Sequence, residues 1–379
     1  MSLRIAIDAS RTTRPEPTGT EHYALRLIQS LIAANESRPA PYHLSLYFRD
    51  APPMGLFATS DYVKEIVIPF PRLWTHLRFA AALQRTRPDI TFVPAHTLPF
   101  AFPGAGLVTV HDLGYRHFPK AHSRVQRAYL ELSTRYSQQR AALVLADSEA
   151  TAADLSRFYG TRTDKIRVVY PGVDGAIRKS SAQDIKSARA KYQLPARYFI
   201  FIGTLQPRKN IERIVKAFRS WQREHDDDAT ALALAGGEGW HFDASWLEGA
   251  TNVIVTGYVD EADKGGLLAG AIALVFPSLY EGFGFPAVEA MHCGTPVIAS
   301  QTSSLPELVG DAGLLVDPLD VAAIAEAMGR CSDDAALREL LSERGIQRAK
   351  RFTWDAAAEH VMVSLDELGR RASNSRSPI

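Results

Sequence analysis

Short apolar runs of strand length alternate along the chain with longer segments in which apolar residues recur at helical spacing. Such alternation is typical of parallel sheets covered by helices on both faces, so the predicted fold class is α/β. In the first half the pattern predicts strands at residues 3–8, 43–48, 63–68, 90–94, 107–111, 143–147 and 166–170, with helices at 21–34, 123–140 and 149–159. In the second half it predicts strands at 198–203, 231–235, 252–257, 271–276, 297–300 and 314–317, again with helices between them.

A polar segment, residues 179–191, separates the two sets of elements. A chain of 379 residues also exceeds the usual size of a single hydrophobic core, which favours two domains. We therefore predict one doubly wound domain over residues 1–190 and a second over 191–354. Helical spacing continues to residue 370, whereas the tail 371–379 is polar and basic, and we expect it to be disordered.

The composition is that of an ordinary globular protein, with 46% apolar and 22% charged residues. No run approaches the roughly 20 apolar residues that a membrane-spanning helix needs. The first strand begins at residue 3, without the apolar region of a secretory signal. Two cysteines, Cys293 and Cys331, are too few for a disulfide framework and fit a reducing compartment. These features predict a cytoplasmic protein.

The net charge of +1 conceals a difference between the two halves of the chain. Residues 1–179 contain 23 Lys and Arg against 15 Asp and Glu, while the remainder contains 20 against 27. A basic half favours an anionic partner, such as a phospholipid surface or a phosphate-bearing acceptor, and nucleic acid is disfavoured because no nucleic-acid-binding motif accompanies the charge. Segments 71–87 and 123–140 are basic with apolar residues interspersed. They fit either peripheral contact with the inner face of the plasma membrane or two amphipathic helices packed on the sheet, and we favour the second reading.

The segment 280–289, Tyr-Glu-Gly-Phe-Gly-Phe-Pro-Ala-Val-Glu, carries the most specific chemistry. It follows an apolar strand, and Pro286 suits the first turn of a helix because its missing N–H costs nothing there. The two glycines let the backbone approach a ligand, and the helix start attracts an anion. Glu281 on the loop and Glu289 in the helix can accept hydrogen bonds from hydroxyls. A site for both phosphate and sugar hydroxyls indicates a sugar nucleotide.

Two other readings of this segment compete with the sugar nucleotide. Glu281 and Glu289 could be ordinary surface carboxylates, but that reading leaves the two glycines between aromatic residues unexplained. Residues 282–287 also match the G-x-G-x-x-A dinucleotide pattern, which belongs on the first strand–helix turn of its domain with an acidic residue after the next strand. Here the pattern lies late in the domain and the next strand ends in Ser300, so we discount it.

A cationic pair, Arg208 and Lys209, lies in the loop 203–210 after the first strand of the second half. Asn210 is a good N-cap for the following helix, so both cations lie at a helix N-terminus, where the helix dipole does not favour positive charge. Their position is explained if they face an anion such as a diphosphate. The alternative is two solvated loop cations, and the glycine loop in the same domain favours the diphosphate.

Two weaker candidates lie in the first half. His111 follows a strand, and Gly19 lies between the first strand and the first helix. Each fits a ligand site at strand ends or a structural role, and the residues alone leave that choice open. Residues 226–228 match the D-x-D pattern of some metal-dependent transferases, but we interpret them as a solvated turn. Neither a Walker A nor an H-E-x-x-H motif is present. We therefore predict no metal and no cofactor beyond the sugar nucleotide.

Together these motifs resemble the retaining glycosyltransferases of family 4, over nearly the whole chain. The resemblance implies the GT-B fold, in which two Rossmann-like domains with doubly wound parallel sheets face a central cleft and a terminal helix, here 355–370, crosses back to the first domain. It also implies transfer of a hexose from a nucleoside-diphosphate sugar to a saccharide or lipid-linked acceptor. The elements that carry it are E-x7-E from Glu281 to Glu289, G-x-L-x-x-R-K-N over residues 203–210, His111-Asp112 and the early loop at Gly19.

The resemblance further implies roles for individual residues. Thr204 stands where some members carry an arginine, so the arrangement around the phosphates departs from theirs. The implied catalytic set, which stabilises the leaving group and positions the sugar, is His111, Arg208, Lys209 and Glu281. The implied contacts to the donor come from Gly19, Gly203, Arg208, Lys209, Phe283, Gly284, Phe285 and Glu289.

The charge of the leaving group and of the residues that face it indicates the mechanism. Cleavage of the sugar–phosphate bond produces a doubly charged leaving group, which Arg208, Lys209 and a helix N-terminus can stabilise without a metal. We predict transfer on the same face of the sugar, with the leaving phosphate helping to deprotonate the acceptor. GDP-mannose is the first candidate donor, because bacterial members with this His-Asp-Leu arrangement often build surface polysaccharides or glycolipids. Two other functions stay open: a nucleotide-sugar epimerase or hydrolase on the same fold, and a non-catalytic nucleotide-sugar-binding protein.

Overall fold

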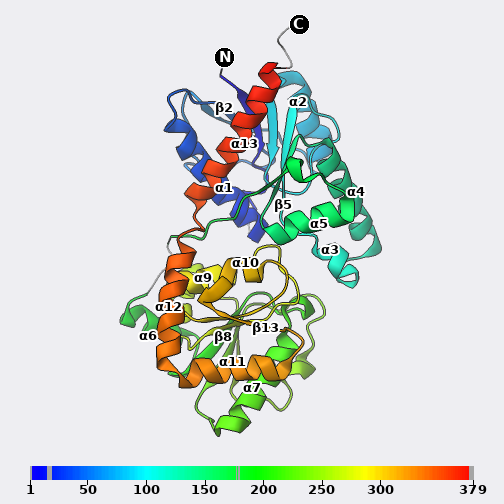
Figure 1. Ribbon diagram of the computed structural model, residues 1–379. Coiled ribbons are helices and arrows are strands. Elements are labelled where there is room, and N and C mark those ends of the chain that lie inside the picture. The colour runs from blue at the N-terminus through cyan, green and yellow to red at the C-terminus, as the bar shows by residue number, and fades with distance from the viewer. Residues whose placement is uncertain (1, 15–18, 176, 178–179, 375–379) are drawn as a thin grey trace. The chain divides into compact units, whose positions relative to one another are not determined.

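The computed structural model describes residues 2–14, 19–175, 177 and 180–374 (Figure 1). Within these residues the chain forms two compact units, each built around its own parallel sheet. The first unit lies within residues 2–115, 122–172 and 353–374, and the second within 116–121 and 173–352. Among the described residues, no helix combines the length and the apolarity that crossing a lipid bilayer requires.

The described part of the first unit contains a 7-stranded sheet in which all neighbouring strands are parallel. The strand order is β3-β2-β1-β4-β5-β6-β7, so the order reverses between β1 and β4. β5 and β6 pair in a register that sets Val110 beside Ala146, the last residue of each strand. The strands are β1 (Arg4–Asp8), β2 (His43–Phe48), β3 (Val63–Val67), β4 (Ile90–Val93), β5 (Ala105–Val110), β6 (Leu143–Ala146) and β7 (Ile166–Val168).

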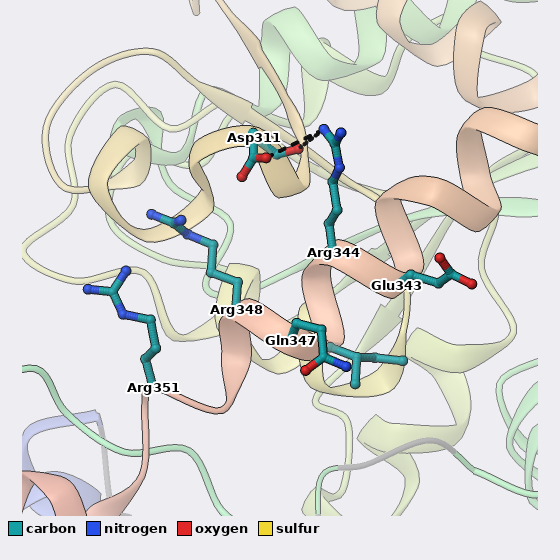
Figure 2. Close-up of a pocket in the computed structure, with 7 residues that line it drawn as sticks. Asp311, Glu343, Arg344, Gln347, Arg348 and Arg351 are labelled. Carbon is teal, nitrogen blue, oxygen red and sulfur yellow. Dashed lines mark hydrogen bonds and ion pairs between the residues drawn. The ribbon is translucent and has the colours of Figure 1, made fainter.

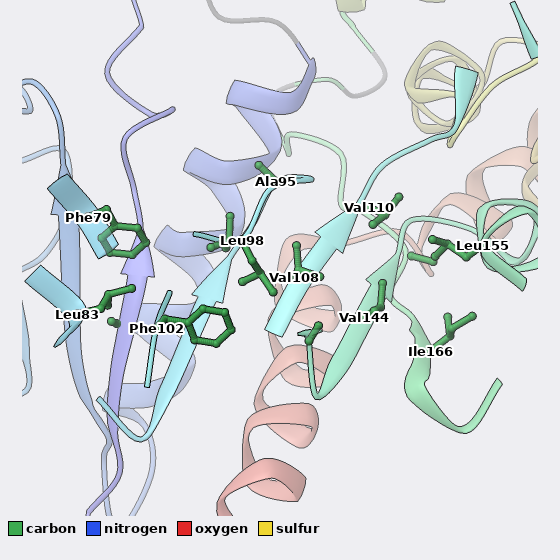
Figure 3. Close-up of a cluster of buried hydrophobic side chains, with 14 of the residues drawn as sticks. Phe79, Leu83, Ala95, Leu98, Phe102, Val108, Val110, Val144, Leu155 and Ile166 are labelled. Carbon is green, nitrogen blue, oxygen red and sulfur yellow. The ribbon is translucent and has the colours of Figure 1, made fainter. Parts of the chain in front are cut away.

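A hydrophobic core lies against this sheet (Figure 3). Phe79 and Leu83, four residues apart on successive helical turns, are buried in one cluster with Phe102 and with Val108 and Val144 of the sheet. Each such side chain contributes about 1.5–3 kcal/mol by its burial. The helical elements up to β7 are α1 (Gly19–Glu36), η1 (Thr75–Phe79, a π-helical turn), α2 (Ala80–Thr86), α3 (Gly114–His117), η2 (Pro119–Ala121), α4 (Arg124–Arg140), α5 (Glu149–Tyr159) and η3 (Thr163–Lys165).

The helix α13 (Trp354–Asn374) is last in the sequence but belongs to the first unit, where it lies beside α1 (Figure 1). Ion pairs of 2.9 Å from Arg38 to Asp366 and from Arg167 to Glu367 fix it there. The expectation of a disordered tail from residue 371 is wrong for residues 371–374, because Arg371 extends the last turn and pairs with Glu367. Residues 375–379 of that tail lie outside the described residues.

The described part of the second unit contains a 6-stranded parallel sheet with the order β10-β9-β8-β11-β12-β13. Here the order reverses between β8 and β11. The strands are β8 (Tyr198–Ile202), β9 (Ala231–Ala235), β10 (Val253–Gly257), β11 (Leu274–Phe276), β12 (Val297–Ser300) and β13 (Leu314–Val316). The helical elements are α6 (Ala182–Lys191), η4 (Pro207–Lys209), α7 (Ile211–His225), η5 (Ala244–Leu247), α8 (Glu261–Ala269), α9 (Phe285–Cys293), α10 (Leu305–Val309), η6 (Gly310–Ala312), α11 (Val321–Asp333) and α12 (Ala335–Ala349).

The two units meet in the sequence at residues 172 and 173, not near residue 190 as the polar segment suggested. The reason is that α6 packs against α8 and so belongs to the second unit. Gly266 of α8 permits this close approach, because a Cβ there would lie 3.0 Å from the carbonyl oxygen of Asp184 and 3.1 Å from the Cβ of Ala188. The polar residues between 179 and 191 are therefore largely the exposed face of a packed helix rather than a linker.

Candidate functional site

Three of the predicted site residues come together in the second unit. Arg208 and Lys209 lie in the loop after β8, and Glu281 lies in the loop after the neighbouring strand β11. Lys209 Nζ is 2.6 Å from Glu281 Oε1, and an Arg208 guanidinium nitrogen is 3.2 Å from Glu281 Oε2. The strand order reverses between β8 and β11, and the carboxyl ends of strands at such a reversal are where doubly wound sheets bind ligands.

The charges in this cluster are buried. Glu281 and Lys209 are both buried, and Lys209 Nζ also lies 4.8 Å from the centre of the Phe276 ring. Burial by itself raises the pKa of Glu281, but the charges of Lys209 and then Arg208 outweigh it, so the pKa lies below its ordinary value. Two cations and one ionised carboxylate are thus held together at the end of the sheet, and the two cations suit an anionic ligand.

Asn210 joins the two loops instead of capping α7. We expected its side chain to accept a hydrogen bond from the helix start, and that expectation is wrong: Asn210 adopts a left-handed conformation with φ 65° and makes no capping bond. Its amide instead donates to the carbonyl oxygens of Pro277, at 2.9 Å, and Pro318, at 2.6 Å. Leu279 N–H also donates to the carbonyl oxygen of Arg208, at 2.9 Å. These bonds hold the cation loop against the glutamate loop.

Residues 281–283 are held by two serines that the sequence did not indicate. The Ser303 hydroxyl accepts the backbone N–H of Glu281 at 2.9 Å. The Ser304 hydroxyl donates to the carbonyl oxygens of Glu281, at 3.1 Å, and of Phe283. Gly284 follows with φ 124°, a conformation that requires glycine, and a Cβ there would also lie 2.8 Å from the Leu305 side chain.

The helix α9 begins at Phe285 with Pro286 in its first turn, as the sequence predicts. Pro286 has no N–H, and the Ala287 N–H donates to the carbonyl oxygen of Gly284 at 3.0 Å, so what α9 offers an anion at its start is chiefly the positive end of the helix dipole. Gly203 follows β8 with φ 140°. A Cβ at Gly236, after β9, would lie 2.0 Å from the Gly203 carbonyl oxygen, so a second glycine that the sequence analysis did not name packs the loops together.

Glu289 pairs with a different cation from Glu281. Its Oε1 lies 3.2 Å from Lys264 Nζ on α8, and Lys264 also pairs with Glu261 at 2.9 Å. Burial raises the pKa of Glu289, and Lys264 offsets only part of this, so the pKa stays above its ordinary value. Burial lowers the pKa of Lys264, but Glu289 and Glu261 outweigh it and the pKa is raised. Lys264 had no signal in the sequence, because a lysine in a helix is ordinarily solvated.

In the first unit, His111 forms a buried pair with Asp147. The two residues directly follow β5 and β6, whose register sets their strand ends side by side. His111 Nδ1 lies 2.7 Å from Asp147 Oδ2, and the Tyr23 ring contacts the imidazole edge-on with ring centres 4.6 Å apart. The Thr151 hydroxyl donates to the carbonyl oxygen of His111 at 3.2 Å. The sequence placed Asp147 at the end of a predicted strand. Its position beside His111 could not be predicted, because it depends on the order of the strands in the sheet.

The neighbours of His111 fix its imidazole and raise its pKa. Burial lowers its pKa, but the carboxylate of Asp147, with a smaller effect from Asp112, outweighs burial and raises the pKa. The backbone N–H of His111 donates to His96 Nε2 at 3.2 Å, so the proton of neutral His96 is assigned to Nδ1. Burial and the charge of His111 lower the pKa of His96 to about 3. Of this pair of rings, His111 is therefore the one that binds a proton more readily.

Gly19 is the first residue of α1. Residues 15–18, the rest of the loop in which we expected a diphosphate contact, lie outside the described residues. The same first turn of α1 carries a buried carboxylate, Glu21, which pairs with Arg11 at 3.0 Å and lies 3.7 Å from Arg14. The role of Gly19 stays a prediction.

A separate pocket of about 690 Å³ lies beside α12 in the second unit (Figure 2). Its arginines serve the local fold: Arg344 pairs with Asp311 at 3.5 Å, and Arg348 donates to the carbonyl oxygens of Glu307, at 2.7 Å, and Leu308 near the end of α10. None of the predicted site residues lines this pocket. The described residues also contain no group of three His, Cys, Asp or Glu side chains arranged to hold a metal ion.

Known proteins resemble this chain along nearly its whole length. Residues 18–176 match the family described as Glycosyltransferase Family 4, and residues 184–348 match Glycosyl transferases group 1. The chain is 32% identical over 356 residues to O-antigen chain mannosyltransferase B of Escherichia coli, which covers 89% of this chain and 93% of that protein. Its fold is similar to sucrose-phosphate synthase from Thermosynechococcus elongatus (24% identity, 98% of this chain and 99% of that chain, TM-score 0.73). It is also similar to HepE from Anabaena in complex with UDP and glucose (18% identity, 96% and 100%, TM-score 0.71).

Proposed function

The chain belongs to glycosyltransferase family 4 and has the GT-B fold, and we propose that it is a retaining hexosyltransferase with a nucleoside-diphosphate sugar as donor. The observation that carries the proposal is the buried cluster of Arg208, Lys209 and Glu281 at the point where the second sheet reverses its order. The cluster lies at the carboxyl ends of the strands, where ligands of this fold bind. A departing diphosphate is the anion that a sugar transferase has to stabilise.

Arg208 and Lys209 bind the donor diphosphate in this proposal, together with the positive end of the α9 dipole. Such fixed donors stabilise charge that develops on the leaving group without any reorganisation during the reaction. The side chains need no metal to do this, so we propose metal-independent transfer. Backbone groups of Gly203, Phe283, Gly284 and Phe285 complete the contacts to the donor.

The two glutamates accept hydrogen bonds from hydroxyls of the donor. Glu281 contacts the transferred sugar, and Glu289 contacts the ribose. The ion pairs of Glu281 with Arg208 and Lys209 support this role, because a carboxylate whose charge is already shared by two cations is a poor nucleophile. Glu281 therefore positions the sugar instead of attacking its anomeric carbon.

Transfer then takes place on one face of the sugar. The bond between the anomeric carbon and the diphosphate oxygen breaks, the acceptor oxygen forms a bond to the same carbon from the same side, and the acceptor proton passes to the leaving diphosphate. His111 lies beside the donor sugar in this proposal, and Asp147 holds its imidazole in one orientation. The anomeric configuration is retained.

Mannose and a saccharide chain are the first candidates for the transferred sugar and the acceptor. The Escherichia coli relative that matches 89% of this chain is named as an O-antigen chain mannosyltransferase. That likeness supports GDP-mannose as donor and a saccharide or lipid-linked acceptor.

A nucleotide panel followed by a transfer assay tests the proposal. GDP, UDP, ADP and dTDP are ranked by the rise in Tm they cause, since a ligand that binds only the folded protein stabilises it. We expect GDP to rank first, and the protein with GDP-mannose to extend a mannose-containing oligosaccharide with a retained configuration, read by NMR of the product. An inverted product would refute same-face transfer. Free sugar or an epimer without acceptor would identify a hydrolase or epimerase, and binding without turnover would identify a binding protein.

A further inference from the structure

Helix α4 in the first unit buries polar side chains on the side that faces the protein, beside the partly buried Leu130 and Tyr136. Ser133, Ser137 and Gln138 are buried, and each makes hydrogen bonds inside the unit: Ser137 Oγ accepts Leu98 N–H at 2.9 Å, and Gln138 Oε1 accepts from Thr161 at 3.0 Å. An amphipathic helix of a globular protein ordinarily buries its apolar side. The favoured reading of residues 123–140 as a helix packed on the sheet is confirmed for Leu130 and Tyr136, which pack against the core of the first unit, but it does not account for the apolar side chains that α4 leaves exposed.

A separate apolar row of α4 faces outward. Val125, Tyr129 and Leu132 are spaced four and three residues apart, so they lie on one face of the helix, and their exposed fractions are 80%, 48% and 66%. Single exposed apolar residues are normal on a protein surface, but an aligned row on a helix indicates a partner.

Neighbouring segments extend this row into one surface. His76 stacks on Phe100 with ring centres 3.9 Å apart, and His76 Nε2 forms a 3.2 Å hydrogen bond with the Tyr129 hydroxyl. The buried Trp74 anchors the same segment by donating to the carbonyl oxygen of Ile68 at 2.8 Å. The α4 surface, as we define it, consists of the exposed apolar side chains Leu73, Leu77, Phe100, Val125, Tyr129 and Leu132.

The charges around the α4 surface are almost all positive. Residues 70–88 contain no Asp or Glu, and residues 123–140 contain one, Glu131, which pairs with Arg135 at 3.3 Å. The exposed arginines of the two segments include Arg72, Arg78, Arg124 and Arg127. Apolar side chains bordered by arginine fit an interface between hydrocarbon and phosphate.

We propose that the α4 surface docks the first unit on an anionic lipid bilayer. The apolar side chains enter the boundary between headgroups and acyl chains, and the arginines contact the lipid phosphates. A second copy of the chain is disfavoured as the occupant, because a two-fold interface would set the same arginines against each other. The proposal goes beyond the proposed function, since docking does not depend on transfer, and it places a lipid-linked acceptor within reach of the enzyme.

Vesicle sedimentation of the full chain tests the docking. We expect the protein to bind vesicles of equal parts phosphatidylcholine and phosphatidylglycerol, and to bind pure phosphatidylcholine at least about tenfold more weakly. The double variant Val125→Asp/Leu132→Asp should lose at least about tenfold in affinity for the anionic vesicles. Both side chains are exposed, so the variant should keep the wild-type melting temperature. Val363→Asp, at an equally exposed position on α13 (61%), is the matched control and should bind as the wild type does.

Several outcomes would overturn the proposal. Absence of binding to the anionic vesicles would do so, as would equal binding to both vesicle types or the same loss in Val363→Asp. A dimer in sedimentation velocity that Val125→Asp/Leu132→Asp dissociates would identify a second copy as the occupant. Transfer to a water-soluble acceptor should be unchanged in the double variant, so failure of docking and failure of the transfer proposal can be distinguished.

Discussion

Replacing Lys264 by methionine should destabilise the second unit by about 3 kcal/mol at neutral pH. Lys264 Nζ lies 3.2 Å from Glu289 Oε1, and only 13% and 9% of the two side chains are exposed. Removing one partner of a buried ion pair costs about 3–5 kcal/mol, because the remaining charge stays without compensation. Protonation of Glu289, whose pKa is already raised, limits the cost, so we expect the lower end of that range.

The loss of stability should depend on pH in one direction. A carboxyl whose pKa is higher in the folded than in the unfolded protein contributes stability that is fully present below the unfolded value and is lost as the pH rises through the folded value. Lys264→Met raises the pKa of Glu289 further, so the loss of unfolding free energy relative to the wild type should be largest near neutral pH. The variant should recover as the pH falls toward the ordinary glutamate value of 4.5. Urea unfolding at several pH values, followed by circular dichroism, measures this.

Two further variants make the test specific. Lys216 pairs with Glu212 at 2.6 Å, but their side chains are 57% and 45% exposed, so Lys216→Met should cost about 0–1 kcal/mol. The double variant Lys264→Met/Glu289→Gln should recover most of the lost stability, because it leaves no unpaired buried charge. An equal loss in the two single lysine variants, or a loss in Lys264→Met that is the same at every pH, would refute the reasoning.

Three other predictions concern the candidate site. Lys209→Ala and Glu281→Ala should each lower turnover by about tenfold or more, and unchanged kinetics in both would contradict the roles proposed for them. Asp147→Asn removes the carboxylate that raises the pKa of His111. Because the imidazole binds its proton more tightly in the folded protein, the pair stabilises the fold fully below the ordinary histidine pKa of 6.5, and this stabilisation is lost as the pH rises through the pKa of folded His111. The loss of unfolding free energy in this variant should therefore be larger on the acidic side of neutrality, and a loss that grows with pH would be inconsistent with the pair. Asn210→Gly keeps the left-handed conformation but removes two buried hydrogen bonds, so a loss of about 2 kcal/mol in urea unfolding is expected, and wild-type stability would show that these bonds do not hold the loops.

The sequence predicts most of the features that depend on local pattern. Alternating apolar runs indicate both parallel sheets, and the loop residues Arg208, Lys209 and Glu281 come after strands, at the edge where ligands bind. The strand order is set by packing between elements distant in the sequence, so the pairing of His111 with Asp147 could not be predicted without it. Long-range bonds likewise outweigh the local preference of Asn210 for capping, because they satisfy two buried carbonyl groups.

The periodicity of apolar residues also does not determine which face of a helix points toward the sheet. The spacing of Val125, Tyr129 and Leu132 identifies an apolar row on α4, but it does not say whether that row faces the sheet or the solvent. Hydrogen bonds from the opposite side decide this, and their partners, Leu98 and Thr161, lie outside the helix. The role of Lys264 could not be predicted from the sequence either, because its burial depends on how α8 and α9 pack.

The position of α13 has a consequence for the synthesis of the protein. Residues 353–374 leave the ribosome after the second unit has been translated, yet they cover α1 near the beginning of the chain, where Trp354 contacts Tyr23 with ring centres 5.8 Å apart. Domains generally form as they are translated, from the amino terminus onward. Here translation of the first unit begins before that of the second unit and is completed after it. A premature stop codon before residue 353 would therefore leave the amino-terminal half with an uncovered apolar helix and expose it to aggregation and proteolysis.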